Sequence, residues 1–193
     1  MFSVRFHGRG GQGVVTAAEL LAAAAFSEGR HAQAFPSFGS ERMGAPVMSF
    51  CRIDDRPIRT HEPVTEPDAL IVQDPTLLHQ ADLLAGLTSS GYMLVNSPRS
   101  FGELGLAEFV SGFRPERLLV VPASSLAMTH LGRPLPGAAM LGGLAALTGT
   151  VSLDSVLAAL TERFPGKVAD GNIAAARAAF AYVLDEREAL TDA

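Results

Sequence analysis

The stretch FHGRGGQGVV, residues 6–15, joins the end of an expected strand to the start of an expected helix through a glycine-rich turn. Upstream, apolar residues alternate with polar ones over residues 2–6, which is the period of a strand. Downstream, residues 14–26 are rich in strong helix formers, and Gly29 is placed to end that helix. The stretch therefore predicts the first strand–turn–helix unit of an α/β sheet.

The rest of the chain continues this alternation of strands and helices. Short apolar runs are typical of buried parallel strands, and apolar residues on both sides of the Asp54-Asp55 pair predict an antiparallel hairpin over residues 46–60. The sequence thus predicts one α/β domain over residues 1–193, with three αβα layers, a mostly parallel sheet, the hairpin and a helical C-terminal third. The further expected strands are 31–35, 69–74, 92–96 and 117–122, and the further expected helices are 75–87, 137–149, 152–164 and 171–190.

Composition excludes several classes of function. The formal net charge of −5 argues against a nucleic-acid-binding protein, which usually has a basic face. The single cysteine, Cys51, excludes an internal disulfide and also an iron–sulfur cluster held by this chain alone. The five histidines have no metal-ligand spacing. Because the N-terminus lacks an apolar signal core and no apolar run is long enough to span a membrane, a cytoplasmic protein is expected.

The glycine turn fits more than one purpose. Gly8, Gly10 and Gly13 have the G-x-G-x-x-G spacing of dinucleotide-binding proteins, and the N–H groups of such a turn favour an anion. An NAD site also needs an acidic residue about 20 positions later, but Gln33 is near that position here. Three interpretations stay open: an NAD(P) site, a tight turn that only packs a strand on a helix, and a loop for another anionic ligand or a partner.

A second loop, residues 36–46, contains Glu41 and Arg42 between glycines, just before an expected strand. Without other information a solvated loop explains these charges. However, Phe35, Phe38 and Met43 are of the types that protein interfaces use near an arginine. The Arg42 guanidinium is also suited to pair with a phosphate or a carboxylate.

Four segments resemble the gamma subunit of the 2-oxoacid:acceptor oxidoreductases, the pyruvate:ferredoxin oxidoreductase family. The resemblance runs from residue 2 to the last expected helix. In one departure, Met43 follows Arg42 where many members have glycine. The four segments are GRGGQGVVTAAELLAAAA (8–25), PSFGSERMGAPVMSFCRI (36–53), PDALIVQDPTLL (67–78) and AAMLGGLAALTG (138–149).

This resemblance implies a subunit of a larger enzyme. Members convert a 2-oxo acid and coenzyme A to acyl-CoA and carbon dioxide, and two electrons pass to ferredoxin or another acceptor. Thiamine diphosphate, Mg and 4Fe-4S clusters are held mainly by the alpha, beta and delta (ferredoxin-like) subunits, so this chain is not expected to be catalytic alone. Pyruvate, 2-oxoglutarate and branched-chain, indolic and aromatic 2-oxo acids all stay open as substrates.

In the family, the gamma part helps to form the coenzyme A site and the contacts between subunits. Two alternatives remain: a stand-alone NAD(P)-dependent Rossmann-type oxidoreductase, for which no Tyr-x-x-x-Lys pair is present, and a non-enzymatic nucleotide-binding module. No catalytic or metal-binding residue is expected. The positions that match the family's loops are Gly8, Arg9, Gly10, Gly11, Gln12 and Gly13 in the glycine turn, and Glu41, Arg42 and Met43 in the second loop.

Overall fold

The computed structural model describes residues 1–37, 43–80 and 82–191. In these residues, six strands form one mixed sheet in the order β2-β3-β1-β4-β5-β6. The pairs β1–β4, β4–β5 and β5–β6 are parallel, whereas β3 is antiparallel to both β1 and β2. The strands are β1 (Phe2–Arg9), β2 (His31–Pro36), β3 (Pro46–Asp54), β4 (Ala69–Val72), β5 (Tyr92–Asn96) and β6 (Leu118–Val121).

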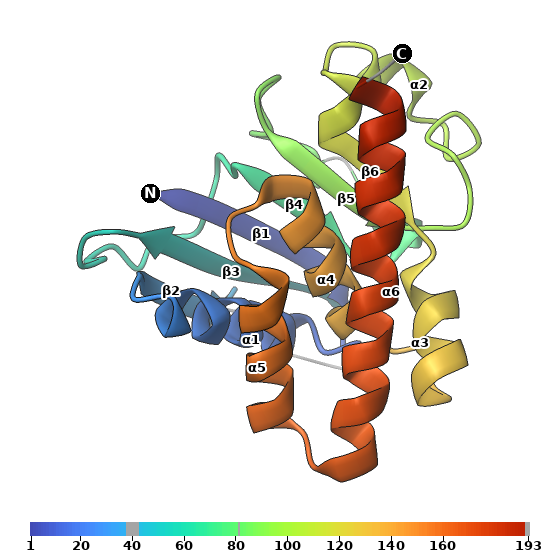
Figure 1. Cartoon of the computed structure of the whole chain (residues 1–193). Coiled ribbons are helices and arrows are strands. Elements are labelled where there is room, and N and C mark those ends of the chain that lie inside the picture. Colours follow the sequence, from blue (N-terminus) through green and yellow to red (C-terminus); the bar gives the residue numbers. More distant parts are fainter. Residues whose placement is uncertain (38–42, 81, 192–193) are drawn as a thin grey trace.

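Helices cover one face of this sheet, as Figure 1 shows for α1, α4, α5 and α6. α4 lies between the sheet and α6, so ten of its twelve residues are buried and it is apolar on all sides. The helices are α1 (Val14–Ser27), α2 (Ala107–Val110), α3 (Ala123–Leu131), α4 (Gly137–Thr148), α5 (Leu153–Arg163) and α6 (Gly166–Thr191), with 3₁₀ turns η1 (Pro75–Leu77) and η2 (Pro115–Arg117).

The opposite face of β4, β5 and β6 has its own apolar core. Leu70, Val72 and Met93 of the sheet pack there against leucines from short turns, including Leu77 and Leu83. This layer contains η1, α2 and irregular segments rather than long helices. The α/β architecture predicted from the sequence is confirmed, and so are the expected strands at β1, β2, β4, β5 and β6 and the helical C-terminal third.

The predicted hairpin over residues 46–60 is wrong in its second arm. Residues 46–54 form β3, but residues 56–60 form no strand. The reason is that β3 already pairs with β1 along one edge and with β2 along the other, so neither edge is free. The antiparallel hairpin of this fold is formed by β2 and β3 instead.

The predicted helix over residues 75–87 is also wrong. Only η1 forms there, and the described residues after it make turns. The buried Arg5 side chain on β1 explains this difference, because its Nη2 donates to the carbonyl oxygens of Leu83 at 2.9 Å and Ala85 at 2.6 Å. Its Nη1 donates to the carbonyls of Val64 and Thr65. Carbonyls that accept from Arg5 are turned toward the sheet rather than along a helix axis.

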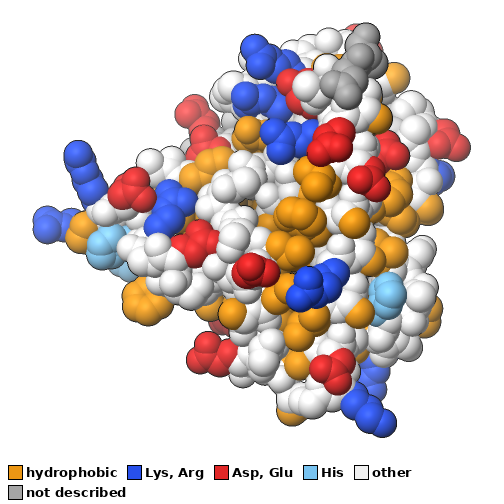
Figure 2. Space-filling model, in the orientation of Figure 1, with side chains coloured by type: hydrophobic (Ala, Val, Ile, Leu, Met, Phe, Trp, Pro, Cys, Tyr) orange, Lys and Arg blue, Asp and Glu red, His pale blue; other side chains and the backbone are white. Residues whose placement is uncertain are grey.

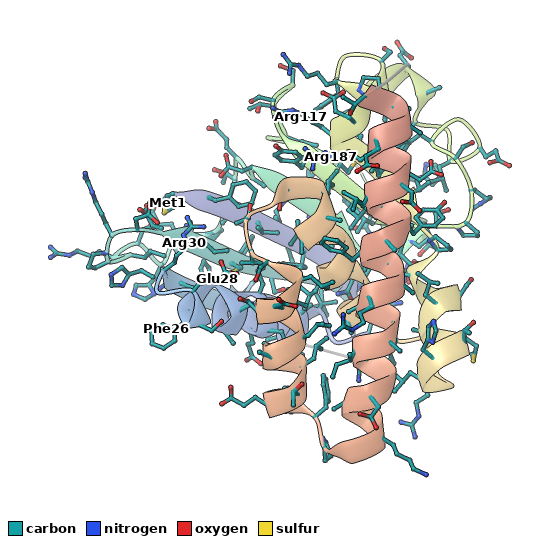
Figure 3. All side chains as sticks on the ribbon, in the orientation of Figure 1. Met1, Phe26, Glu28, Arg30, Arg117 and Arg187 are labelled. Carbon is teal, nitrogen blue, oxygen red and sulfur yellow. The ribbon has the colours of Figure 1, made fainter. Side chains whose placement is uncertain are left out.

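Hydrogen bonds near the helix ends set the position of α5 relative to α1. Glu28, at the C-terminus of α1, accepts from the N–H of Ser152 at 2.7 Å, and Nη1 of Arg30 donates to the Thr150 carbonyl at 3.2 Å. Figure 3 labels Glu28 and Arg30 beside the loop that leads into α5. Arg187 similarly ties α6 to the end of α4 through the Ala146 carbonyl at 3.0 Å. These contacts fix the start of α5 near the C-terminal end of α1, and α6 against the end of α4.

His7 on β1 makes stability dependent on pH. Burial, and then the charge of Arg5, lowers the pKa of His7 from 6.5 to about 4. The unfolded chain therefore takes up a proton between pH 6.5 and pH 4 that the folded chain does not, so stability falls as the pH falls through this range. We expect a loss of roughly 2 kcal/mol between pH 7 and pH 5 from this group. Urea unfolding of the wild type and of His7→Gln at several pH values measures this loss. An equal pH dependence of the free energy of unfolding in the two proteins would contradict it.

Candidate functional site

The glycine turn lies where the connections of two neighbouring parallel strands leave on opposite faces of the sheet. β1 continues into α1 on the helical face, whereas β4 continues into η1 on the other face. In open α/β sheets a ligand crevice forms at such a point, beyond the carboxyl ends of the strands. Residues 10–13 follow β1 and residues 73–74 follow β4, so both segments border this crevice.

Three glycines of the turn are required by its geometry. Gly11 and Gly13 have φ of +91° and +72°, which disfavours any residue with a Cβ. A Cβ on Gly8 would lie 2.6 Å from Cγ2 of Val14, so only glycine lets α1 pack this close to β1. Gly11 and Gly13 are exposed, and their N–H groups have no partner among the described residues. They are therefore available to an anion at the start of α1.

Arg9 and Gln12 hold the turn onto the segment after β4. The Gln12 side chain accepts from the Arg9 N–H at 2.8 Å and donates to Oδ2 of Asp74 at 2.9 Å. Nε of Arg9 lies 3.3 Å from the same Asp74 oxygen, and Nη2 donates to the Thr76 hydroxyl at 2.9 Å. Both polar side chains of the turn are thus engaged inside the chain.

Asp74 is the acceptor at the centre of this network. Partial burial favours its protonated form, but hydrogen bonds from Thr76 and Gln12 and the nearby Arg9 guanidinium outweigh that effect and hold the pKa of Asp74 below its ordinary value. Oδ1 of Asp74 also accepts from the Thr76 N–H at 3.0 Å and so caps η1. The carboxylate therefore stays ionised at neutral pH, and it neutralises Arg9 rather than leaving that charge for a ligand.

The structure brings the second predicted loop against the glycine turn. Gly10 donates to the Ala45 carbonyl at 2.9 Å and accepts from the Gly44 N–H at 3.0 Å, which forms an isolated bridge to Met43. The Met43 side chain is 87% exposed, and its Sδ lies 2.5 Å from the position of a Cβ built on Gly11. Met43 therefore covers the outer side of the turn. Phe38, Glu41 and Arg42 lie outside the described residues.

The order of the strands disfavours the NAD interpretation. The strand beside β1 on this side is β3, which is antiparallel to β1. β2, whose end carries the ribose-binding acid in dinucleotide folds, is separated from β1 by β3. Gln33 of β2 instead makes a hydrogen bond with the His61 ring at 2.7 Å.

Sequence reasoning missed the buried polar residues at the ends of β4 and β5. Gln73 is 1% exposed, and neither side-chain atom of its amide has a partner among the described residues. Asn96 donates to the Gln73 carbonyl at 2.8 Å and accepts from the Ser124 N–H at 3.0 Å. The available signal was a polar residue directly after each apolar strand, because such residues meet at the same edge of a parallel sheet.

Sequence reasoning also missed a cavity of about 460 Å³ on the helical side of the glycine turn. The turn forms one wall, and the others come from the first turns of α4 and α6 and the ends of α3 and α5. Arg133, Arg163 and Lys167 line it, and no acidic residue does. Arg163 and Lys167 are four residues apart at the α5–α6 bend, but Arg133 is distant from both in the sequence, so no local pattern connects all three.

Cys51 is unsuited to hold a metal or to act as a nucleophile. It is fully buried in β3, and burial raises the pKa of its thiol to about 12. Elsewhere in the described chain, no group of three or more histidine, cysteine, aspartate or glutamate side chains is placed to bind a metal ion. None of the described helices combines the length and the apolar character needed to cross a bilayer.

A family model described as pyruvate ferredoxin/flavodoxin oxidoreductase matches residues 3–182. The chain belongs to this family. The match includes both the glycine turn and the segment that bridges to it, so the resemblance read from these loops is confirmed.

Relatives within the pyruvate ferredoxin/flavodoxin oxidoreductase family match almost end to end. The gamma subunit common to the pyruvate and ketoisovalerate oxidoreductases of Thermococcus kodakarensis is 48% identical over 180 residues, which cover 93% of this chain and 96% of that one. Pyruvate synthase subunit PorC of Methanothermobacter marburgensis is 45% identical over the same shares. The crystal structure of the pyruvate oxidoreductase subunit PORC of Thermotoga maritima is 37% identical, with a TM-score of 0.79 over 93% of this chain and 95% of that one.

Proposed function

We propose that this chain is the gamma subunit of a multisubunit, thiamine-dependent 2-oxoacid:acceptor oxidoreductase that converts a 2-oxo acid and coenzyme A to acyl-CoA. Two relatives of nearly the same length support this. One, 48% identical, is named the gamma subunit common to pyruvate and ketoisovalerate oxidoreductases, and the other, 45% identical, is named subunit PorC of pyruvate synthase. Its partners are then the alpha, beta and delta subunits and, through them, ferredoxin or another electron acceptor. In this proposal residues 1–193 act as a single domain.

The glycine turn is the proposed contribution of this chain to the coenzyme A site. The observation that carries this role is the pair of exposed N–H groups on Gly11 and Gly13, at the positive end of α1. Such donors suit the diphosphate of coenzyme A. Arg9 and Gln12 act as positioning residues, because their bonds to Asp74 hold the turn in place.

Thiamine diphosphate, Mg and 4Fe-4S clusters supply decarboxylation and electron transfer when bound by the partner subunits. The buried Cys51 does not fit a cluster ligand, which supports the proposal that the partner subunits hold these groups. The part of this chain is to bind coenzyme A, orient it toward its partners and keep water from the shared site. Gly8, Gly10, Glu41, Arg42 and Met43 complete the proposed binding surface.

The test is the coenzyme A dependence of the assembled enzyme with Gly11→Ala. A methyl group there strains a residue with φ of +91° and displaces Met43 across the turn. We expect the KM for coenzyme A to rise about tenfold or more, which corresponds to about 1.4 kcal/mol. The KM for the 2-oxo acid and the rapid reduction of the complex by the 2-oxo acid alone stay at their wild-type values.

Gly29→Ala is the matched control, since Gly29 has a similar φ of +79° at the far end of α1 and a Cβ there would meet nothing within 4 Å. Arg42→Ala extends the test to the second loop, with an expected loss in affinity of roughly 10- to 150-fold for a phosphate contact. If both site variants assemble fully and the coenzyme A constant does not move, the two loops form a subunit joint instead.

The surface supports assembly with partner subunits. Met43, Phe26 and Met128 are large apolar residues that are 87%, 74% and 50% exposed. Figure 2 shows further hydrophobic side chains along α6, bordered by charged ones. Val168 and Tyr182 of α6 are among the exposed apolar residues. Contact with the alpha or beta subunit would remove such residues from water.

A further inference from the structure

The cavity beside the glycine turn concentrates positive charge on a protein that is acidic as a whole. Three of its lining residues, Arg133, Arg163 and Lys167, are cations and none is an acid, although the formal net charge of the chain is −5. None of the three makes a salt bridge to any residue that the structure describes. Cations without a salt-bridge partner that converge on one cavity, two from the α5–α6 bend and one from the loop after α3, favour an anionic ligand.

The place of Lys167 strengthens this point. It lies in the first turn of α6, where the helix dipole is positive and a cation is unfavourable. No acidic residue in that turn offsets it. Arg163 is the last residue of α5, where the helix dipole favours a cation even without a ligand. Arg133 lies outside any helix, just after the end of α3. Lys167 is therefore the cation whose position the stability of its own helix does not account for.

Backbone geometry adds to the positive potential. The first turns of α1, α4 and α6 line the cavity through Thr16, Gly137 and Lys167. Figure 1 shows α5 and α6 meeting in a bend at one end of the molecule, which brings the last turn of α5 next to the first turn of α6. Arg163 and Lys167 flank this bend.

The remaining walls are apolar. Leu20, Leu131 and Phe164 line the cavity, together with Leu135 and Val168, which are 37% and 43% exposed. Inorganic phosphate would leave these side chains in contact with water. A ligand with a flat ring attached to its phosphates would cover them and remove their apolar surface from water, which favours binding.

We propose that this cavity binds a phosphorylated nucleoside, with Arg133 and Lys167 on its phosphate groups and the apolar walls around its ring. The inference deepens the proposed function and rests on it in one respect: coenzyme A has a phosphorylated adenosine at the end remote from its thiol. A free adenine nucleotide has the same chemistry, so the experiment separates these two sources.

The test is isothermal titration of the full chain with adenosine 3′,5′-bisphosphate, ADP, coenzyme A and pyrophosphate. We expect the bisphosphate and coenzyme A to bind, and Arg133→Ala and Lys167→Ala each to weaken both by about tenfold or more. Both side chains are exposed, so the variants keep the fold, and Lys167→Glu gives a larger loss by charge reversal. Arg177→Ala, an exposed arginine of α6 outside the cavity, is the matched control and stays at the wild-type affinity.

Each result has one meaning. Binding of ADP but not coenzyme A, lost in the two variants, supports the cavity and overturns its role in a coenzyme A site. Coenzyme A binding that is lost in Gly11→Ala but unchanged in Arg133→Ala and Lys167→Ala overturns the cavity and leaves the proposed function standing. Pyrophosphate binding as tight as that of the bisphosphate overturns the nucleoside. Absence of binding to the wild type overturns the inference.

Discussion

Replacing Arg5 with methionine is expected to destabilise the protein by about 3–5 kcal/mol, which is a large part of the 5–15 kcal/mol typical of a whole domain. The residue Arg5 is 5% exposed. Its guanidinium donates to four carbonyl oxygens, those of Val64, Thr65, Leu83 and Ala85. Methionine has a similar apolar length but cannot donate. Each buried carbonyl that loses its donor costs about 1–3 kcal/mol.

The effect is measured by urea unfolding of Arg5→Met at neutral pH. Arg59→Met serves as the control, because Arg59 is exposed and its loss is expected to change stability by less than about 0.5 kcal/mol. If the two variants unfold at the same midpoint, the segments around residues 64 and 84 are held by their leucines and not by Arg5. The same result would remove the explanation given above for the missing helix.

The second large effect is expected at the α4–α6 contact. A Cβ on Gly142 would lie 2.1 Å from the carbonyl oxygen of Ala176 and 2.9 Å from its Cα, so the backbone of α6 must move to admit a methyl group. We expect Gly142→Ala to destabilise the protein by about 3 kcal/mol, even though alanine is the better helix former. Thermal unfolding measures the change.

Two glycines of the same helix provide graded controls. A Cβ on Gly143 meets only side-chain ends, Cδ2 of Leu94 at 2.9 Å and Cγ2 of Val183 at 3.2 Å, so Gly143→Ala is expected to cost less. A Cβ on Gly137 meets nothing closer than 3.9 Å, so Gly137→Ala is expected to be neutral or stabilising by up to about 1 kcal/mol. A loss that is equal at all three positions would sink the close-approach argument.

Much of the fold could be predicted because it depends on local patterns. Alternation over residues 2–6, the apolar run of β4 and the helix formers of α1 report burial and backbone preference residue by residue. The glycine turn was recognisable for the same reason, since Gly11 and Gly13 need a positive φ that their own residue type permits. The family followed from these motifs and is confirmed by the match over residues 3–182.

The two wrong elements, the second arm of the hairpin and the helix over residues 75–87, depended on partners distant in the sequence. Residues 56–60 have a plausible strand pattern, but β1 and β2 already occupy both edges of β3. The leucines after Pro75 suit a helix, yet the Leu83 and Ala85 carbonyls accept hydrogen bonds from Arg5 of β1 instead. Local propensity loses to such contacts, because a buried guanidinium without acceptors costs more than one helical turn provides.

The sequence by itself therefore determined the α/β class, the position of the glycine turn and the family. Only the tertiary structure decided what surrounds that turn. In the folded chain Arg9 and Gln12 bind the Asp74 carboxylate, and the Met43 side chain lies next to Gly11. One cavity beside the turn is lined by Arg133, Arg163 and Lys167. The physical reason is that charge and hydrogen bonding act through space: residues from four separate segments set the potential at the turn, and no spacing along the chain encodes their meeting.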